Sequence, residues 1–237
     1  MRRRAPAAVN ALLLAALAAQ CVLHALGPAR LPPAAIAMPQ PPPAPPAVAA
    51  LRLASLGDGP AAARLVMLYL HALDTGVPLR ELDYGRLAGW LETALALDPR
   101  SQQPLVAAAQ VYGAVADPAR VRIMLDVVER AFAADPARRW PAMAQAVLAA
   151  RHRLHDMALA RRYAQAIRLR APSAPAWARQ LELFILSDMN ELDSARAVAG
   201  ALLAGGTVTD PNEIAFLEGR LRELERAASH RRHGQVR

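Results

Sequence analysis

LETALALDPR (residues 91–100) decides the fold, because the chain repeats it in altered form as ERAFAADPAR (129–138) and QAIRLRAP (165–172). Each copy is the end of an apolar-striped segment, and each contains a proline, which cannot continue a helix because it lacks the backbone N–H. These prolines lie 37 and then 36 residues apart. A fixed period in the range of about 20–50 residues is typical of solenoids. The sequence therefore predicts an all-α fold, in which antiparallel helix pairs stack as a short α-solenoid.

Apolar spacing predicts four helix pairs. The first pair opens at Gly59-Pro60 and ends at Pro99, and the second turns at Asp117-Pro118, which is a helix-start signal. The third pair is expected to start at Trp140-Pro141, and the fourth runs from Pro175 to Gly205-Gly206, a helix-end signal. The residues expected in the core include Leu65, Leu68, Tyr69, Ala72, Leu87, Leu91, Val121, Met124, Leu125, Val128, Phe132, Met143, Val147, Tyr163, Ile167, Ile185, Ala195, Val198, Ala199 and Leu202.

A last helix closes the predicted stack. It opens with Asp210 as the cap and Pro211 as the first residue, and Glu213 is placed as in a capping box. Its charged outer face suits a terminal repeat, because one side of such a repeat faces solvent and must be polar. The helical-repeat domain is thus expected to span residues 49–228, and residues 229–237 are expected to form a frayed basic tail.

The paired helices with a closing proline resemble the tetratricopeptide repeat over residues 83–206. That family places Ala five residues before the proline, and Ala94 and Ala131 match this position whereas Ile167 does not. Trp140 and Trp177 provide aromatic residues near the start of two first helices. The period of 36–37 residues is longer than the 34 of the family. The resemblance implies a right-handed superhelix whose concave face, lined by first helices, holds peptides or protein segments.

The N-terminal 27 residues predict a basic stub and a membrane anchor. Arg2, Arg3 and Arg4 precede an uncharged, largely apolar run over residues 7–27, and about 20 such residues suffice to span a bilayer. Arginines before the run favour a cytoplasmic N-terminus. The layout resembles bacterial repeat proteins that are anchored in the inner membrane by a single span, with the helical domain in the periplasm.

Two alternatives stay open for this segment. Ala16-Leu17-Ala18 forms a signal-peptide cleavage pattern, so a secreted, soluble repeat protein is the first alternative. Cys21 could be the acylated residue of a lipoprotein, but Gln20 before it departs from the small residue that this processing requires. As the single cysteine of the chain, Cys21 also excludes an internal disulfide.

Residues 28–48 are predicted to be a proline-rich linker. Consecutive prolines at 32–33, 41–43 and 45–46 favour the polyproline II conformation. At about 3.1 Å per residue, the segment could hold the helical domain up to about 60 Å from the membrane. A simple spacer is favoured over a ligand for SH3-type domains.

Charge placement argues against a nucleic-acid binder. The net charge is +8 and all 28 basic residues are Arg, but seven of these Arg lie before or after the part expected to fold. Between residues 52 and 226, 21 Arg are matched by all 20 acids. A nearly neutral folded part lacks the basic surface that nucleic-acid binding requires.

No catalytic residues, cofactor site or small-molecule site are predicted. His152 and His155 are spaced to share a metal, but a polar helix end facing solvent is the favoured explanation, so no metal site is predicted. An enzyme or an accessory subunit of a membrane enzyme complex that used this region is the competing class.

The sequence therefore favours a non-enzymatic, membrane-anchored adaptor with a protein partner. Residues 138–179 contain nine Arg and one acid, whereas residues 181–228 contain nine acids and four Arg. This polarity suggests docking of an acidic partner segment. The expected partner-binding residues are Arg138, Arg139, Arg151 and Arg153, which flank the first helix of the third pair.

Overall fold

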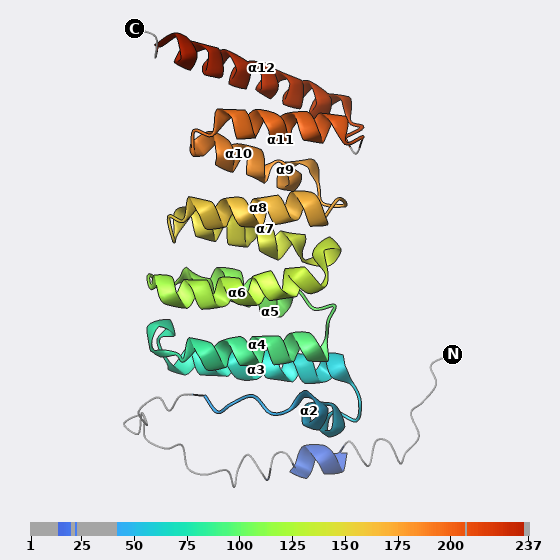
Figure 1. Cartoon of the computed structure of the whole chain (residues 1–237). Helices are drawn as coiled ribbons and strands as arrows, with labels where there is room; N and C mark the ends of the chain where they lie inside the picture. The colour runs from blue at the N-terminus through green and yellow to red at the C-terminus, as the bar shows by residue number, and fades with distance from the viewer. Residues whose placement is uncertain (1–13, 20–21, 23–41, 207, 235–237) are drawn as a thin grey trace, which may run out of the picture. The chain divides into compact units, whose positions relative to one another are not determined.

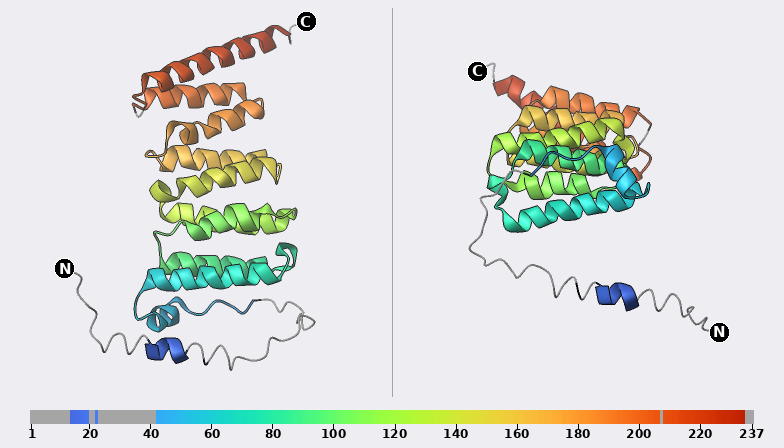
Figure 2. Two further views of the ribbon diagram at one scale, coloured as in Figure 1. Left: turned by 180° about the vertical axis from the view of Figure 1, so that it is seen from behind. Right: turned by 90° about the horizontal axis from the view of Figure 1, so that it is seen from below.

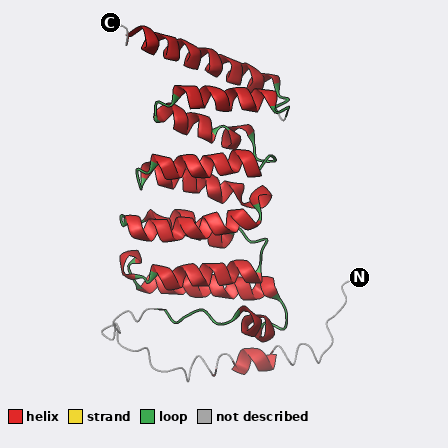
Figure 3. Ribbon diagram, viewed as in Figure 1, coloured by secondary structure: helices red, strands yellow, loops and turns green. Residues whose placement is uncertain are grey.

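The structure is a computed structural model that describes residues 14–19, 22, 42–206 and 208–234. The chain forms two units, Met1–Gln40 and Pro41–Arg237. Every regular element within the described residues is a helix and none is a strand (Figure 3). The predicted all-α fold is therefore confirmed.

The first unit is described only in part. Residues 14–19 are helical, whereas the rest of the predicted anchor at 7–27, apart from residue 22, lies outside the described residues, as does the basic stub. No helix within the described residues combines the length and the apolar character needed to cross a membrane.

The second unit contains the α-helices that Figure 1 labels and, between them, the short helices η1, η2 and η3. In chain order they are α2 (Val48–Ala54), α3 (Gly59–Gly76), η1 (Leu79–Glu81), α4 (Tyr84–Leu97), α5 (Gln103–Val106), the π-helix η2 (Ala107–Val111), η3 (Tyr112–Ala114), α6 (Pro118–Ala134), α7 (Pro136–His152), α8 (Met157–Arg170), α9 (Ala176–Arg179), α10 (Leu181–Asp188), α11 (Leu192–Ala204) and α12 (Pro211–Gly234). From α3 to α12 they stack in chain order, and helices that follow one another in the chain pack together (Figures 1 and 2).

Aspartates start many of these helices. Asp117 accepts hydrogen bonds from the backbone N–H groups of Ala119 and Arg120, so the helix start predicted at Asp117-Pro118 is confirmed. Asp210 accepts from Asn212 N at 2.9 Å at the start of α12. Such a side chain satisfies donors of the first turn that have no partner within the helix.

The expected start of the third pair is wrong. The helix α7 begins at Pro136, directly after Asp135, rather than at Trp140. Asp135 ends α6 and also caps α7, because its carboxylate accepts a hydrogen bond from Arg138 N at 3.2 Å. Pro136 therefore both stops one helix and opens the next, a position where its fixed φ suits a first turn.

The core prediction is confirmed for α6 and α11 but wrong for α3. Phe132 on α6 is 1% exposed. On α3 the expected Leu65 and Leu68 are 64% and 65% exposed, whereas Val66 and Leu70 are buried. Two faces of α3 are apolar, so the periodicity could not decide which of them packs on α4.

The predicted linker ends earlier than expected. Residues 42–47 are extended and pack on α4, and Val48 already begins α2. In Figure 1 this extended segment runs beneath α4 at the end of the stack opposite α12. At the other end, α12 continues through Gly234, into the region predicted to be a frayed tail. Residues 28–41 lie outside the described residues.

A buried polar network joins α3, α4 and η3. The Tyr112 hydroxyl donates to the Asp74 carboxylate, with distances of 2.9 and 3.0 Å to its two oxygens. The Tyr84 hydroxyl donates to the Tyr112 carbonyl at 3.1 Å. Burial and the neighbouring Asp74 carboxylate raise the pKa of Tyr112, so its hydroxyl stays protonated and remains a donor.

Candidate functional site

The four arginines expected to bind a partner do not form one cluster. Arg138 lies in the first turn of α7, and its Nε is 3.2 Å from the Asp135 carboxylate. Arg151 lies in the last turn of α7 and pairs with Asp188 of α10 at 2.7 Å. Arg153 follows α7 and donates to the Gly113 carbonyl. Each of these side chains therefore has a contact within the chain.

Arg139 is the most enclosed of the four. It is 4% exposed, and its guanidinium donates to the backbone carbonyls of Pro99 and Ser101 in the connection after α4. Burial lowers its pKa, and the nearby Asp135 carboxylate opposes this shift. Arg139 therefore links α7 to the preceding connection instead of projecting into solvent.

The charge polarity of the sequence corresponds to ion pairs between helices. Four arginines from the basic segment 138–179 contact acids from the acidic segment 181–228. The pairs are Arg151–Asp188 at 2.7 Å, Arg161–Glu191 at 2.9 Å, Arg168–Glu182 at 2.7 Å and Arg179–Glu213 at 3.4 Å. The two segments thus neutralise one another where they meet. Glu213, expected in a capping box, is used in this way and also accepts from Gln180 at 3.1 Å.

Three other acid–arginine pairs join α6 to its neighbours. Arg122 contacts Asp156 at 2.9 Å, Arg130 contacts Glu92 at 2.6 Å, and Glu129 contacts Arg162 of α8 at 2.9 Å. Spacing along α6 suggests instead that Arg122 and Arg130 pair with Asp126 of the same helix. Contacts between helices fix the relative position of successive pairs, which pairs within one helix cannot do.

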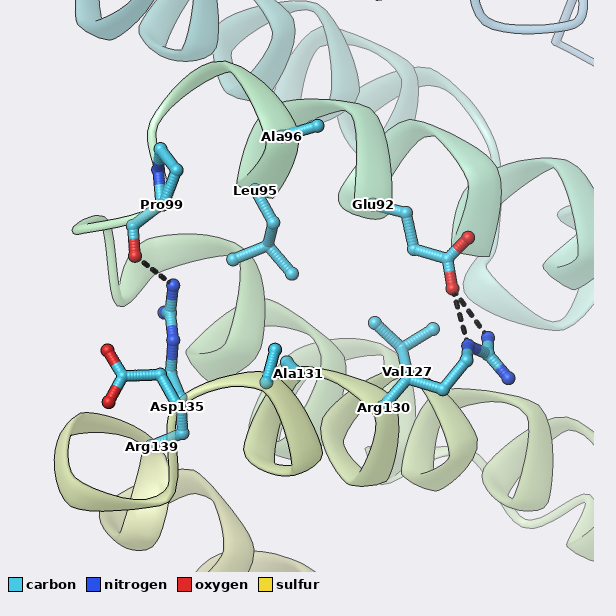
Figure 4. Close-up of a pocket in the computed structure, with 10 residues that line it drawn as sticks. Glu92, Leu95, Ala96, Pro99, Val127, Arg130, Ala131, Asp135 and Arg139 are labelled. Carbon is cyan, nitrogen blue, oxygen red and sulfur yellow. Dashed lines mark hydrogen bonds and ion pairs between the residues drawn. The ribbon is translucent and has the colours of Figure 1, made fainter.

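A groove of about 640 Å³ lies between α4 and α6 (Figure 4). Leu95 and Ala96 line it from α4, and Val127 and Ala131 line it from α6. Figure 4 shows the Glu92–Arg130 pair at one end and Arg139, bonded to the Pro99 carbonyl, at the other. The groove can therefore accept an apolar group whose flanking atoms are polar.

The sequence indicated only one residue of this groove. Arg139 belongs to the predicted partner-binding set, whereas the apolar lining and the Glu92–Arg130 pair were missed. One signal in the sequence could have indicated the Glu92–Arg130 pair. The two residues have opposite charges and lie 38 positions apart, which is close to one repeat period. Periodicity shows which residues recur, but it does not show how far apart two second helices lie.

The two histidines considered as metal ligands are exposed at the end of α7. His152 is the last residue of the helix, and His155 has a positive φ of 51° in the following turn. The adjacent Asp156 caps α8 and pairs with Arg122. Among the described residues, no group of three or more His, Cys, Asp or Glu lies close enough to hold a metal ion.

Comparison of the chain with protein-family models, with curated proteins and with solved structures found no match. Within the residues that the structure describes, the protein is an all-α stack of helices, and the groove between α4 and α6 is its candidate site.

Proposed function

We propose that the chain is a membrane-anchored, non-enzymatic adaptor that binds a segment of another protein on the surface of a tetratricopeptide-like α-solenoid. The order of the helices supports this proposal, because α3 to α12 pack on their neighbours in chain order. The recurring proline ends of α4, α6 and α8 add support, since a fixed period is typical of such solenoids.

The observation that carries the proposal is the groove between α4 and α6. Its volume of about 640 Å³ is open to solvent along two neighbouring helices, and Leu95, Val127 and Ala131 give it an apolar floor. An exposed apolar groove with polar ends is a common place for a partner's side chains to dock.

The partner that fits this groove is a peptide segment with an apolar side chain at its centre. Arg130 at one end offers a partly exposed guanidinium, which suits a carboxylate of the partner. The proposed partner still carries an acidic group, as the sequence suggests. Its main contact, however, is with the apolar floor of the groove and not with the arginines of α7. Binding should therefore weaken only modestly as salt rises, since exposed charges are screened and apolar contacts are not.

Site-specific photocrosslinking tests the proposal. A photoreactive residue in place of Ala96 or Ala134, both exposed and both lining the groove, should crosslink one defined protein partner in the cells that produce the chain. Ala215, an exposed alanine on α12, provides the matched control position and should not crosslink that partner. Equal labelling from Ala215, or none from the groove, would reject the groove as the binding site.

Substitution gives an independent measurement. Ala134→Arg should place a long side chain at the rim of the groove and reduce partner capture, because Ala134 lies at the end of α6. Ala215→Arg adds the same side chain on α12 and should leave capture unchanged. Thermal unfolding of both variants should match the wild type, since both positions are exposed.

The anchor in this proposal rests on the composition of residues 7–27. A reporter that is active only outside the cytoplasm, fused after Arg237, should be active, and the protein should stay with membranes after a carbonate wash. A shortened, soluble product would instead favour cleavage after Ala18.

A further inference from the structure

The extended segment before α2 is bound to α4 through its backbone. The Pro42 carbonyl accepts a hydrogen bond from Arg86 Nη1 at 2.7 Å, and the Pro43 carbonyl accepts one from Trp90 Nε1 at 2.9 Å. Pro42 is buried, although the residues after it are more exposed. At the end of the segment, Ala47 has φ −56° and ψ 136°, close to the polyproline II conformation.

Both donors lie on one face of α4, one helical turn apart. Residues four positions apart are neighbours on a helix surface, so Arg86 and Trp90 present their N–H groups to consecutive carbonyls of the segment. A polyproline II helix forms no internal hydrogen bonds, which leaves its carbonyls free to accept. The two bonds therefore recognise the backbone conformation of the segment and make no contact that requires a particular side chain.

Gly89 provides a flat surface for a proline ring between these donors. A Cβ atom added at Gly89 would lie 3.3 Å from Cγ of Pro45 and 3.7 Å from its Cδ. Glycine inside a helix costs about 1 kcal/mol relative to alanine. The contact with Pro45 gives a physical reason for accepting this cost, because a larger side chain would push the ring away.

Trp90 supplies an aromatic surface, and packing on α3 fixes the position of its ring. Its side chain is 7% exposed, and its ring packs on Tyr69 of α3 with 4.9 Å between ring centroids. Asp83 lies 3.4 Å from Arg86 Nε and thereby helps to orient that guanidinium. Domains that bind proline-rich peptides use the same combination, an aromatic surface with donors directed at the peptide carbonyls.

We propose that Arg86, Gly89 and Trp90 form a binding site for proline-rich peptides in the polyproline II conformation, and that residues 42–46 of the chain are the ligand that occupies it. The site differs from the groove of the proposed function, because Leu95 and Ala96 on the same helix line that groove instead. A tethered ligand acts at an effective concentration of about millimolar. Another proline-rich segment can therefore bind only when the chain's own segment leaves.

The test uses the full-length chain and a fluorescent peptide with the sequence of residues 38–47, MPQPPPAPPA. Changing Pro42, Pro43 and Pro45 together to Gly should weaken the tethered ligand and leave α4 intact. By fluorescence anisotropy, this variant should bind the peptide at least about tenfold more tightly than the wild type, because the tethered competitor is lost. Changing Pro32 and Pro33 to Gly provides the matched control, with binding equal to that of the wild type.

Changes on α4 identify the site in the same assay. In the background of the three Pro→Gly changes, Gly89→Leu should abolish peptide binding by filling the position of the Pro45 ring. Trp90→Phe keeps an aromatic ring but removes the donor, so it should weaken binding several-fold. Circular dichroism should report the same helix content for each variant.

A measurement on the wild-type chain covers the case in which the Gly variant does not fold. A millimolar peptide that carries a nitroxide at its N-terminus should broaden the indole N–H resonance of Trp90, which Trp90→Phe identifies, whereas the same labelled peptide with Gly in place of every Pro should not. If neither the Gly variant nor this titration shows selective binding, or if the Gly peptide binds equally well, residues 42–46 are a fixed part of the fold and the proposal is wrong.

Discussion

Arg168 Nε donates to Glu182 Oε2 at 2.7 Å, and this contact joins α8 to α10 inside the stack. The Glu182 side chain is 2% exposed, so its carboxylate depends on Arg168 for compensation of its charge. The pair lies where the basic and acidic segments of the sequence meet. Removing one partner of such a buried pair leaves an uncompensated charge in a poorly solvated position.

Arg168→Met should therefore destabilise the fold by about 3–5 kcal/mol, measured by urea unfolding. The double change Arg168→Met with Glu182→Leu should be much closer to the wild type, because neither charge remains buried. The pair Arg130–Glu92 between α6 and α4, whose side chains are 60% and 45% exposed, is the control, and its removal should cost less than about 1 kcal/mol. If removal of either pair lowered the free energy of unfolding equally, burial would not explain the importance of Arg168–Glu182.

Phe132→Ala should cost about 3–5 kcal/mol, because the ring is fully enclosed in the core and its removal leaves a cavity. Phe216→Ala on α12 is the matched control, since that ring is 45% exposed and should lose far less. Chemical denaturation of both variants measures the difference. A cost below about 0.5 kcal/mol for Phe132 would show that α6 presents another face to the core.

Tyr112→Phe should destabilise the fold by about 1.5–3 kcal/mol, because Asp74 would lose a hydrogen bond to its charged carboxylate inside the structure. Tyr69→Phe is the control, because it removes a hydroxyl from another tyrosine, on α3, that takes no part in the hydrogen bonds joining Tyr84, Tyr112 and Asp74. Its effect on the midpoint of thermal unfolding should be smaller. Equal shifts for the two variants would argue against the network around Asp74.

Asp156→Ala should show a pH-dependent cost. The Leu159 amide donates to the Asp156 carboxylate and Arg122 pairs with it, and both contacts lower its pKa below the ordinary value. The ionised form is thus the one that the fold stabilises. Its contribution is complete above the ordinary carboxyl pKa of about 3.9 and is lost as the pH falls through the lowered value in the folded state.

At pH 7 this variant should lose about 0.5–2 kcal/mol, as for other lost helix caps. Urea unfolding at a series of pH values should show the difference from the wild type shrinking once the solution becomes more acidic than about pH 4. Asp193→Ala, at a side chain of α11 that is 90% exposed, is the control and should cost less at pH 7 than Asp156→Ala. A constant difference across the series would contradict the assignment of the stabilisation to the ionised carboxylate.

Exchanging the charges of Arg151 and Asp188 separates stability from binding. Arg151→Glu alone should lower the thermal midpoint, since it would replace the ion pair with Asp188 by two carboxylates that repel each other. Adding Asp188→Arg should restore most of the loss. If Arg151 also contacts a partner, the restored double variant should still bind that partner less tightly. Full recovery of partner binding would show that Arg151 contacts Asp188 of α10 and does not contact the partner.

The sequence alone determined most helix ends and the buried face of several helices. Asp117-Pro118 and the cap at Asp210 act within one turn, so their effect does not depend on what the helix later contacts. Phe132 lies on a single apolar stripe of α6, which left only one face to bury. The all-α class follows from these local rules, because the apolar spacing fits a helical period throughout.

Only the tertiary structure decided which groups meet across helices. Leu65 and Leu68 are exposed because α3 has two apolar faces, and packing against α4 selects the other one. Arg139 could be recognised as a cation near a helix start, but its burial depends on the carbonyls of Pro99 and Ser101. The docking of Pro42 and Pro43 on Arg86 and Trp90 joins residues more than 40 positions apart. Such contacts depend on the distance and angle between elements, and one-dimensional spacing contains neither quantity.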